Sequence, residues 1–200
     1  MQWCSDELLV PGKMSAYPWY AVYTKHQHEK TACDALSRQG FEVFLPLYAA
    51  AHRWKDRTKT VLLPFFPCYL FLRADLQRKV DILKTPGVFW LVESGGRACE
   101  VPESDIDGIR RIVQSPARAE PHPVLKSGEY VRVSKGPLAG LRGILTRMKS
   151  NLRLVLSVDL LQKAIAVEVD LSMVEPVNGP GNGVPLVTEF RPNREGATFA

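Results

Sequence analysis

The sequence predicts an α+β fold in two parts, an antiparallel sheet flanked by helices and then a small all-β barrel. Strand-like and helix-like segments alternate up to residue 113, whereas the segments after residue 124 are strand-like alone. Between them, residues 114–123 (QSPARAEPHP) carry three prolines and no apolar periodicity, which is typical of an extended linker. The 200 residues are enough for two small domains.

The first domain is predicted at residues 17–113, after a short irregular extension at 1–16. Aromatic and β-branched content indicates its strands, and apolar residues three and four apart indicate its helices. Gly40 and Pro86 follow two of the predicted helices, as residues that end helices do. We expect one antiparallel sheet with helices packed on it. The elements in order are a strand at 19–25, a helix at 27–39, a strand at 41–47, a hairpin at 51–60, an extended arm at 61–72, a helix at 74–84, a strand at 88–93, a turn at 94–96 and a helix at 102–113.

The second domain is predicted at residues 124–177 and contains only short strands separated by turn residues. This number of strands in so short a segment fits a small SH3-like barrel. Residues 178–200 begin with the run NGPGNG and are predicted to be a disordered tail. The predicted strands are 130–133, 143–145, 152–158, 165–169 and 173–177.

Composition limits the classes of protein that the chain can belong to. The formal net charge of +5 permits contact with nucleic acid without proving it. No apolar run approaches the ~20 residues of a membrane span, and the N-terminus does not resemble a secretory signal. The four cysteines are scattered and form no C-x-x-C pair, so we expect reduced thiols, a cytoplasmic location and no metal site.

No group of residues suggests catalysis. His26 and His28 lack a nearby cysteine or carboxylate at metal-site spacing. The turn at 94–96 lacks the lysine and helix of a phosphate-binding loop. Asp105 and Asp107 lie two residues apart, so they diverge around a helix. We therefore expect no enzyme activity, no catalytic residue and no cofactor.

Segment 65–72 (FFPCYLFL) is the most informative strand-like segment. In a strand, Tyr69 and Phe71 point to one face, and Leu70 and Leu72 point to the other. If helices cover only one face of the sheet, the two aromatic residues form an exposed patch of the kind that binds partners. The alternative is that both faces are buried core.

Segment 131–144 (VRVSKGPLAGLRGI) is the second informative motif. A strand runs into a Gly136-Pro137 turn, a second turn follows at Gly140, and the next strand begins through Gly143. Glycine supplies backbone conformations that other residues resist, so this spacing is specific.

Together these motifs resemble the family of NusG-like transcription elongation and antitermination factors, of the NusG/RfaH type. Segments 19–25, 65–71 and 85–88 match the family's N-terminal (NGN-like) domain, and 131–144 matches its KOW motif. The resemblance implies a non-enzymatic, monomeric factor that binds bacterial RNA polymerase and suppresses pausing or termination. We expect it to contact no membrane.

The resemblance also implies which residues bind polymerase. The patch for the clamp helices of the largest subunit would comprise Tyr23, Tyr69, Phe71, Leu91 and Ile106. Contact with the gate loop of the second-largest subunit would fall on Arg78, Lys79 and Val80.

Basic residues suggest a second, nucleic-acid-binding surface. Cations can bind phosphates and a tryptophan can stack on bases of a single strand. The family places this side near the non-template DNA strand; the alternative is a solvated hairpin without a ligand. The residues are Lys25, His26, Arg53, Trp54, Lys55, Arg57 and Lys59.

In the KOW domain, Leu161 and Lys163 fall where the family contacts Rho or a ribosomal protein. Leu161 replaces an aromatic residue of general NusG, and Cys68 replaces a glycine. These departures favour a specialised, operon-specific paralogue. An alternative is a ribosome- or RNA-associated KOW protein without polymerase contact, and a remote third is an uncharacterised enzyme.

Overall fold

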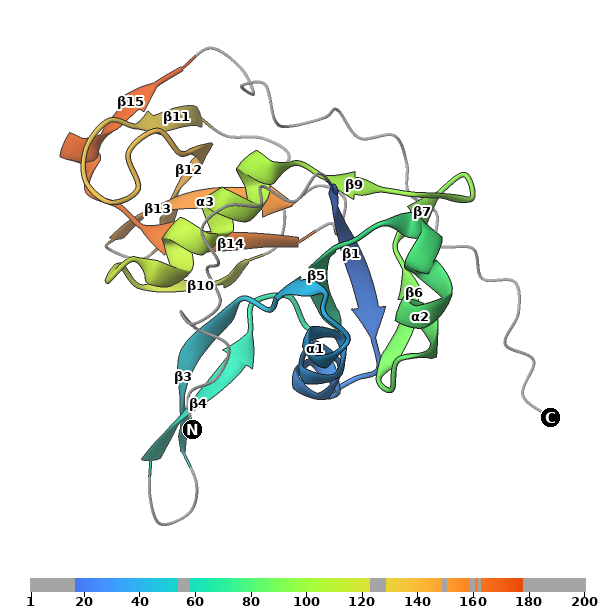
Figure 1. The fold of residues 1–200 in the computed structure, drawn as a ribbon. Helices are drawn as coiled ribbons and strands as arrows, with labels where there is room; N and C mark the ends of the chain where they lie inside the picture. The colour runs from blue at the N-terminus through green and yellow to red at the C-terminus, as the bar shows by residue number, and fades with distance from the viewer. Residues whose placement is uncertain are drawn as a thin grey trace.

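The computed structural model describes residues 17–53, 58–122, 129–148, 151–158, 161 and 163–177. These residues form a mixed α/β structure with antiparallel sheets and few helices, in agreement with the predicted class (Figure 1). None of the described helices is long and apolar enough to cross a membrane.

An antiparallel sheet forms the centre of the first domain. Its strands run in the order β2-β5-β1-β6, and β9 also pairs with β1. In the register, Ala21 lies opposite Phe71, and Val22 lies opposite both Leu70 and Leu91. The strands are β1 (Trp19–Thr24), β2 (Glu42–Phe44), β5 (Tyr69–Arg73), β6 (Val88–Leu91) and β9 (Glu100–Val101).

Alternation along β1 divides the core between the two faces of this sheet. Tyr20 and Val22 join the cluster that contains the buried residues of helices α1 (Glu29–Arg38) and α2 (Lys79–Lys84). Trp19 and Ala21 join the cluster on the other face, with the buried residues of helix α3 (Glu103–Gln114). Figure 1 shows α3 beside the second domain, with α1 and α2 away from it.

Two predicted elements are interrupted. The predicted helix at 74–84 begins as a 3-10 turn, η1 (Leu76–Arg78), because the Asp75 carboxylate accepts the Gln77 N–H, and it continues as α2. The predicted arm at 61–72 breaks before β5 at Cys68, which has a φ of 67°. The backbone N–H of Cys68 donates to the Glu29 carboxylate at 2.8 Å, which fixes this turn on the start of α1.

Two hairpins extend the first domain. The predicted basic hairpin is the ribbon of β3 (Leu47–Arg53) and β4 (Thr58–Pro64), which projects from the body in Figure 1. Residues 54–57 lie outside the described residues. The predicted turn at 94–96 is confirmed between β7 (Glu93–Ser94) and β8 (Arg97–Ala98).

The second domain is an antiparallel sheet in the order β10-β14-β13-β12-β11-β15. The predicted strands are all present, but β10 lies within residues 114–123, predicted as linker, and pairs with β14. No pairing that closes this sheet into a barrel is found among the described residues. The elements are β10 (Ala119–His122), β11 (Glu129–Val133), β12 (Arg142–Met148), β13 (Asn151–Val158), β14 (Lys163–Glu168), η3 (Leu171–Met173) and β15 (Val174–Pro176).

A buried arginine holds β10 on this sheet. Arg153 of β13 is 7% exposed and forms ion pairs with Glu120 of β10 and Glu168 of β14. A buried cation is stable only when such partners compensate for its lost hydration. Glu120, which lies in the predicted linker, therefore helps to hold residues 119–122 on the sheet as an edge strand.

Candidate functional site

Four aromatic side chains form a cluster at one end of the central sheet. The Tyr23 ring stacks on Trp90, with centroids 4.6 Å apart, and meets Tyr69 edge-on at 5.1 Å. Phe89 packs edge-on against Trp90 at 4.8 Å. Phe89 is 55% exposed and Trp90 46%, whereas Tyr23 and Tyr69 are half-buried. We call Tyr23, Tyr69, Phe89 and Trp90 the aromatic cluster.

The polar groups of the cluster lie in a partly dehydrated environment. Burial raises the pKa of Tyr69 and of Tyr23, so both phenols are neutral at physiological pH. Burial also raises the pKa of Cys68, and the carboxylate of Glu29 acts in the same direction. The Cys68 thiol is therefore protonated, and its Sγ lies 3.8 Å from Nδ1 of His26. A protonated thiol is a poor nucleophile, which argues against catalysis here.

Three of the five predicted docking residues are buried, so the expectation of an open patch is wrong for them. Phe71 is 0% exposed and packs against Phe66 at 5.7 Å and Phe44 at 6.1 Å. Ile106 is 0% exposed because it lies on the buried face of α3. Leu91 belongs to the cluster on the opposite face of the sheet, with α1 and α2, so it shares no surface with Phe71.

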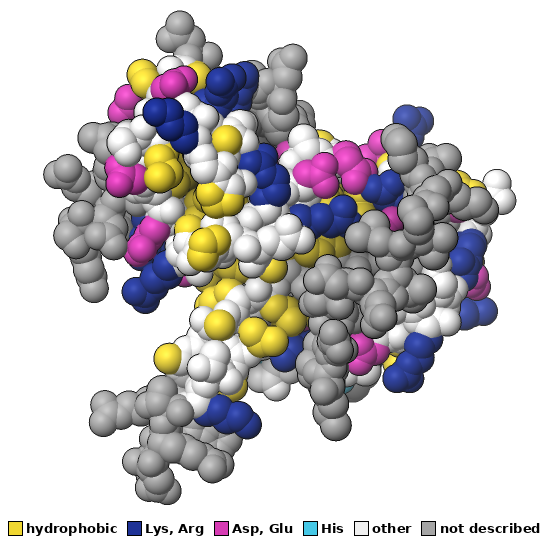
Figure 2. Space-filling model, turned by 60° about the vertical axis from the view of Figure 1, so that its left-hand side comes forward, with side chains coloured by type: hydrophobic (Ala, Val, Ile, Leu, Met, Phe, Trp, Pro, Cys, Tyr) yellow, Lys and Arg dark blue, Asp and Glu magenta, His cyan; other side chains and the backbone are white. Residues whose placement is uncertain are grey.

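The apolar face that carries Phe71 lies in a core shared by both domains. Trp19, Phe71 and Ile106 belong to the same hydrophobic cluster as Leu141 and Leu154 of the second domain. Hydrophobic side chains form a band from the second domain toward the β3–β4 ribbon (Figure 2). The second domain therefore covers part of this face, an arrangement we call closed.

Helix α3 contacts the second domain through a polar side chain and through a glycine. The Arg111 guanidinium donates to the carbonyl oxygens of Pro137 at 3.0 Å and Ala139 at 2.5 Å. A Cβ atom at Gly108 would lie 3.3 Å from Cδ2 of Leu156 and 3.4 Å from Cδ2 of Leu141. The second domain thus packs closely against the helix at Gly108, where little room is left for a side chain larger than a methyl group.

The predicted contact site of the second domain is only half accessible. Leu161 is 5% exposed within the shared core, which corrects the expectation that it projects from a loop. Lys163 is exposed, and its charge acts on the Cys68 thiol of the first domain.

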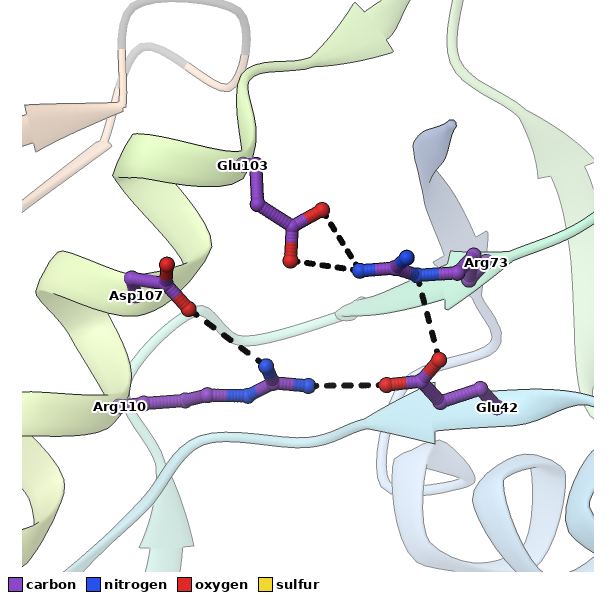
Figure 3. A network of polar contacts seen from close by, with 5 residues as sticks. All are labelled: Glu42, Arg73, Glu103, Asp107 and Arg110. Atoms are coloured by element: carbon purple, nitrogen blue, oxygen red, sulfur yellow. Dashed lines mark hydrogen bonds and ion pairs between the residues drawn. The ribbon is translucent and has the colours of Figure 1, made fainter. Parts of the chain in front are cut away.

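An ion-pair network fastens α3 to the central sheet (Figure 3). Arg73 of β5 pairs with Glu103 of α3 at 2.5 Å and with Glu42 of β2 at 3.2 Å. Arg110 of α3 pairs with Glu42 at 3.1 Å and with Asp107 at 3.6 Å. Both guanidinium groups also lie about 5 Å from the ring of Trp19, at 4.9 and 5.1 Å. The network fixes the helix that carries the interdomain contacts.

Replacing Arg73 by methionine is expected to lower the free energy of unfolding of the first domain by about 1–2 kcal/mol, because two ion pairs and a cation–π contact are lost. Urea unfolding followed by tryptophan fluorescence measures this loss. The difference from wild type should shrink in about 1 M NaCl, where charges are screened. Arg97→Met in the exposed hairpin is the matched control, and an equal loss in both variants would contradict the role of the network.

The predicted gate-loop residues lie on η1 and the start of α2. Val80 is 58% exposed. Lys79 forms an ion pair with Glu93, and Arg78 lies 4.0 Å from the centroid of the Phe41 ring. The three residues therefore differ in how freely they can meet a partner.

The predicted nucleic-acid-binding residues are only partly described. Lys25 and His26 are exposed in the turn between β1 and α1, beside the aromatic cluster. Lys59 is exposed on β4, opposite His52 of β3, and Arg53 ends β3. Trp54, Lys55 and Arg57 lie outside the described residues.

Sequence reasoning missed two members of the aromatic cluster, Phe89 and Trp90. They lie in the middle of a four-residue strand whose burial pattern does not alternate, because the pairing of β1 with β6 shifts register between Tyr23 and Thr24. The apolar run 88–91 was the available signal, but we interpreted residues 88–93 only as a strand and assigned no exposed role to Phe89 or Trp90.

No metal site emerges within the part of the chain that the structure describes, since no three His, Cys, Asp or Glu side chains group together there.

Comparison with known proteins shows which proteins the chain resembles. The family model NusG, described as transcription termination factor nusG, matches residues 17–110. The transcription termination/antitermination protein NusG of Pseudomonas aeruginosa is 24% identical over 175 residues, which cover 80% of this chain and 98% of that protein. The NusG of Yersinia pestis is 33% identical over 116 residues, covering 56% of this chain and 64% of that protein.

A solved structure supports the fold. It is described as the domain interaction in Thermotoga maritima NusG, and it matches with a TM-score of 0.53 at 19% identity, covering 80% of this chain and 97% of that one. The family model spans the sheet that carries the aromatic cluster. Residues 17–110 of this chain therefore match the NusG family model, and the chain as a whole is similar to NusG proteins at low identity.

Proposed function

We propose that this protein binds bacterial RNA polymerase and suppresses pausing or termination, at a restricted set of operons. The observation that carries the proposal is the aromatic cluster, with Phe89 and Trp90 exposed at the end of an apolar sheet face. Exposed aromatic residues in such a cluster are the usual anchors of protein interfaces. The proteins it resembles are named as transcription termination/antitermination proteins.

The clamp helices of the largest polymerase subunit are the proposed partner of the apolar face. Tyr23 and Tyr69 are reachable in the closed arrangement, whereas Phe71 and Ile106 become reachable only when the second domain leaves. Leu91 drops out of the proposed patch because it lies on the other face. The gate-loop contact rests mainly on Val80, whose exposure supports it. Binding to both the clamp helices and the gate loop would bridge the two large polymerase subunits and stabilise the polymerase in its processive form.

Nucleic acid is a proposed second partner. Lys25 and His26 are exposed next to the aromatic cluster, and Lys59 is exposed on the ribbon, so phosphates of a non-template strand can approach them. Coupling to Rho or to a ribosome through Leu161 and Lys163 requires the open arrangement, since Leu161 is buried in the closed one.

The proposal predicts that Tyr23→Ser combined with Tyr69→Ser weakens binding to purified core RNA polymerase by roughly 30-fold, about 2 kcal/mol, which is the size of a hot-spot loss. The same variant should lose its effect on pausing in a single-round transcription assay. Both rings are half-buried, so far-UV circular dichroism must first show that the variant is folded.

The matched control is Val113→Ser with Met173→Ser, which removes two exposed apolar side chains outside the proposed surface. Its affinity should equal that of wild type. Unchanged polymerase binding by the folded tyrosine variant, or recovery of ribosomal proteins in place of polymerase, would contradict the proposal.

A further inference from the structure

The apolar face of the central sheet has a covered part and an open part. Tyr69 and Phe71 lie two residues apart on β5 and therefore point to the same face. Phe71 is sealed in the core that both domains share, and Tyr69 packs against the edge of that core. Tyr69 also contacts Tyr23, which stacks on the exposed Trp90. The aromatic cluster is thus the continuation of the covered face into solvent.

The boundary between the two parts lies on β5, between the buried Phe71 and the half-buried Tyr69. Cys68, directly before Tyr69, is half-buried, and its Sγ lies 3.8 Å from Nδ1 of His26. Among the described contacts of Phe89 and Trp90, the ring contacts are with each other and with Tyr23, within the first domain. Their exposure therefore persists while the protein is closed.

The residues around the cluster are mainly cationic or neutral. Lys25 and His26 are exposed on the first domain, and Lys163 is exposed on the second. The acid near this boundary, Glu29, is buried, and its carboxylate accepts the Cys68 N–H. A partner that fits here presents apolar side chains flanked by carboxylates, since complementary charge raises association rates.

We propose that the aromatic cluster is the entry point for RNA polymerase on the closed protein. Polymerase first binds Phe89 and Trp90, and it then takes over the rest of the face as the second domain leaves. This inference rests on the proposed function and adds an order of events to it. A binding surface that is mostly covered has an apparent affinity reduced by the fraction of open molecules. An exposed part of the same surface allows binding to begin without waiting for the protein to open.

The test compares association rates of purified core polymerase with full-length proteins, measured by biolayer interferometry. Phe89→Ser with Trp90→Ser should slow association with the closed protein by about tenfold or more, as the loss of two anchors predicts. In a Gly108→Glu background, which we expect to be open, the same pair should slow association only about two- to threefold, since the whole face is then available. Val113→Ser with Met173→Ser is the control for loss of exposed apolar area.

Each outcome decides between the two proposals. Equal association rates for wild type and the Phe89 and Trp90 variant, or the same slowing in both backgrounds, would overturn the entry point and leave the proposed function intact. Absence of polymerase binding by both wild type and Gly108→Glu would overturn the proposed function and the entry point together. Loss of binding to a labelled oligo(dT) strand, with polymerase association unchanged, would instead assign the cluster to nucleic acid. The single variant Phe89→Ser repeats the test if the double variant is unstable.

Discussion

Replacing Gly143 by alanine is expected to destabilise the second domain by about 3 kcal/mol or more, at the upper end of overpacking effects. A Cβ atom at this position would lie 2.5 Å from the carbonyl oxygen of Val155 and 3.1 Å from its carbonyl carbon. Gly143 belongs to β12 and Val155 to the paired strand β13, so the clash is with backbone. A side chain can rotate away from such a contact, but a paired strand can yield only by breaking its hydrogen bonds.

Tryptophan fluorescence reports mainly on the first domain in this measurement. All four, Trp3, Trp19, Trp54 and Trp90, precede the second domain, so their fluorescence reports on the N-terminal part of the chain. Urea unfolding of Gly143→Ala should show an early transition by far-UV circular dichroism. The fluorescence should follow this transition only in part, through Trp19 in the shared core, and should complete its change when the first domain unfolds. Arg142→Ala, an exposed neighbour on the same strand, should unfold like wild type. Coincident, unshifted transitions for Gly143→Ala would show that the strands tolerate the Cβ.

Local patterns predicted the elements well because each depended on a short-range cause. Apolar spacing gave α1, and a proline at the start with acidic residues first and basic residues last gave α3. The alternation of segment 65–72 correctly separated Tyr69 and Phe71 from Leu70 and Leu72. The break at Cys68 could not be predicted in this way, because it depends on a hydrogen bond to Glu29, which is distant in sequence.

The sequence could not predict how much of the apolar face of the central sheet is exposed, for the same reason. Phe71 is buried against Phe44 and Phe66, in a core that residues of the second domain also join, and such contacts between distant segments cannot be predicted from local alternation. The three prolines of residues 114–123 indicated a linker, yet the ion pair of Glu120 with Arg153 holds residues 119–122 on the sheet as a strand. The pairing of β6 with β1 is also irregular, so Phe89 and Trp90 are both exposed, whereas regular alternation would expose only one of them.

Gly108→Glu is expected to open the protein. In the closed arrangement the new side chain would meet the methyl groups of Leu141 and Leu156, where a Cβ alone is already at 3.3–3.4 Å. Burying a carboxylate there without a partner costs several kcal/mol, and about 3 kcal/mol shifts the ratio of closed to open molecules roughly 150-fold. Glutamate is also a better helix former than glycine, so α3 itself should remain intact.

Small-angle scattering should therefore show a larger radius of gyration for Gly108→Glu, and the affinity for polymerase should rise with the open fraction. Gly108→Ala is the matched control, because the ends of two leucine side chains can yield by a few tenths of an ångström and keep the protein closed. An unchanged radius for Gly108→Glu would mean that contacts other than α3 hold the domains together. A larger radius without tighter polymerase binding would mean that the covered face, with Phe71 and Ile106, is not where polymerase binds. The radius of gyration therefore tests whether α3 holds the two domains together, and the affinity tests whether the face covered by the second domain binds polymerase.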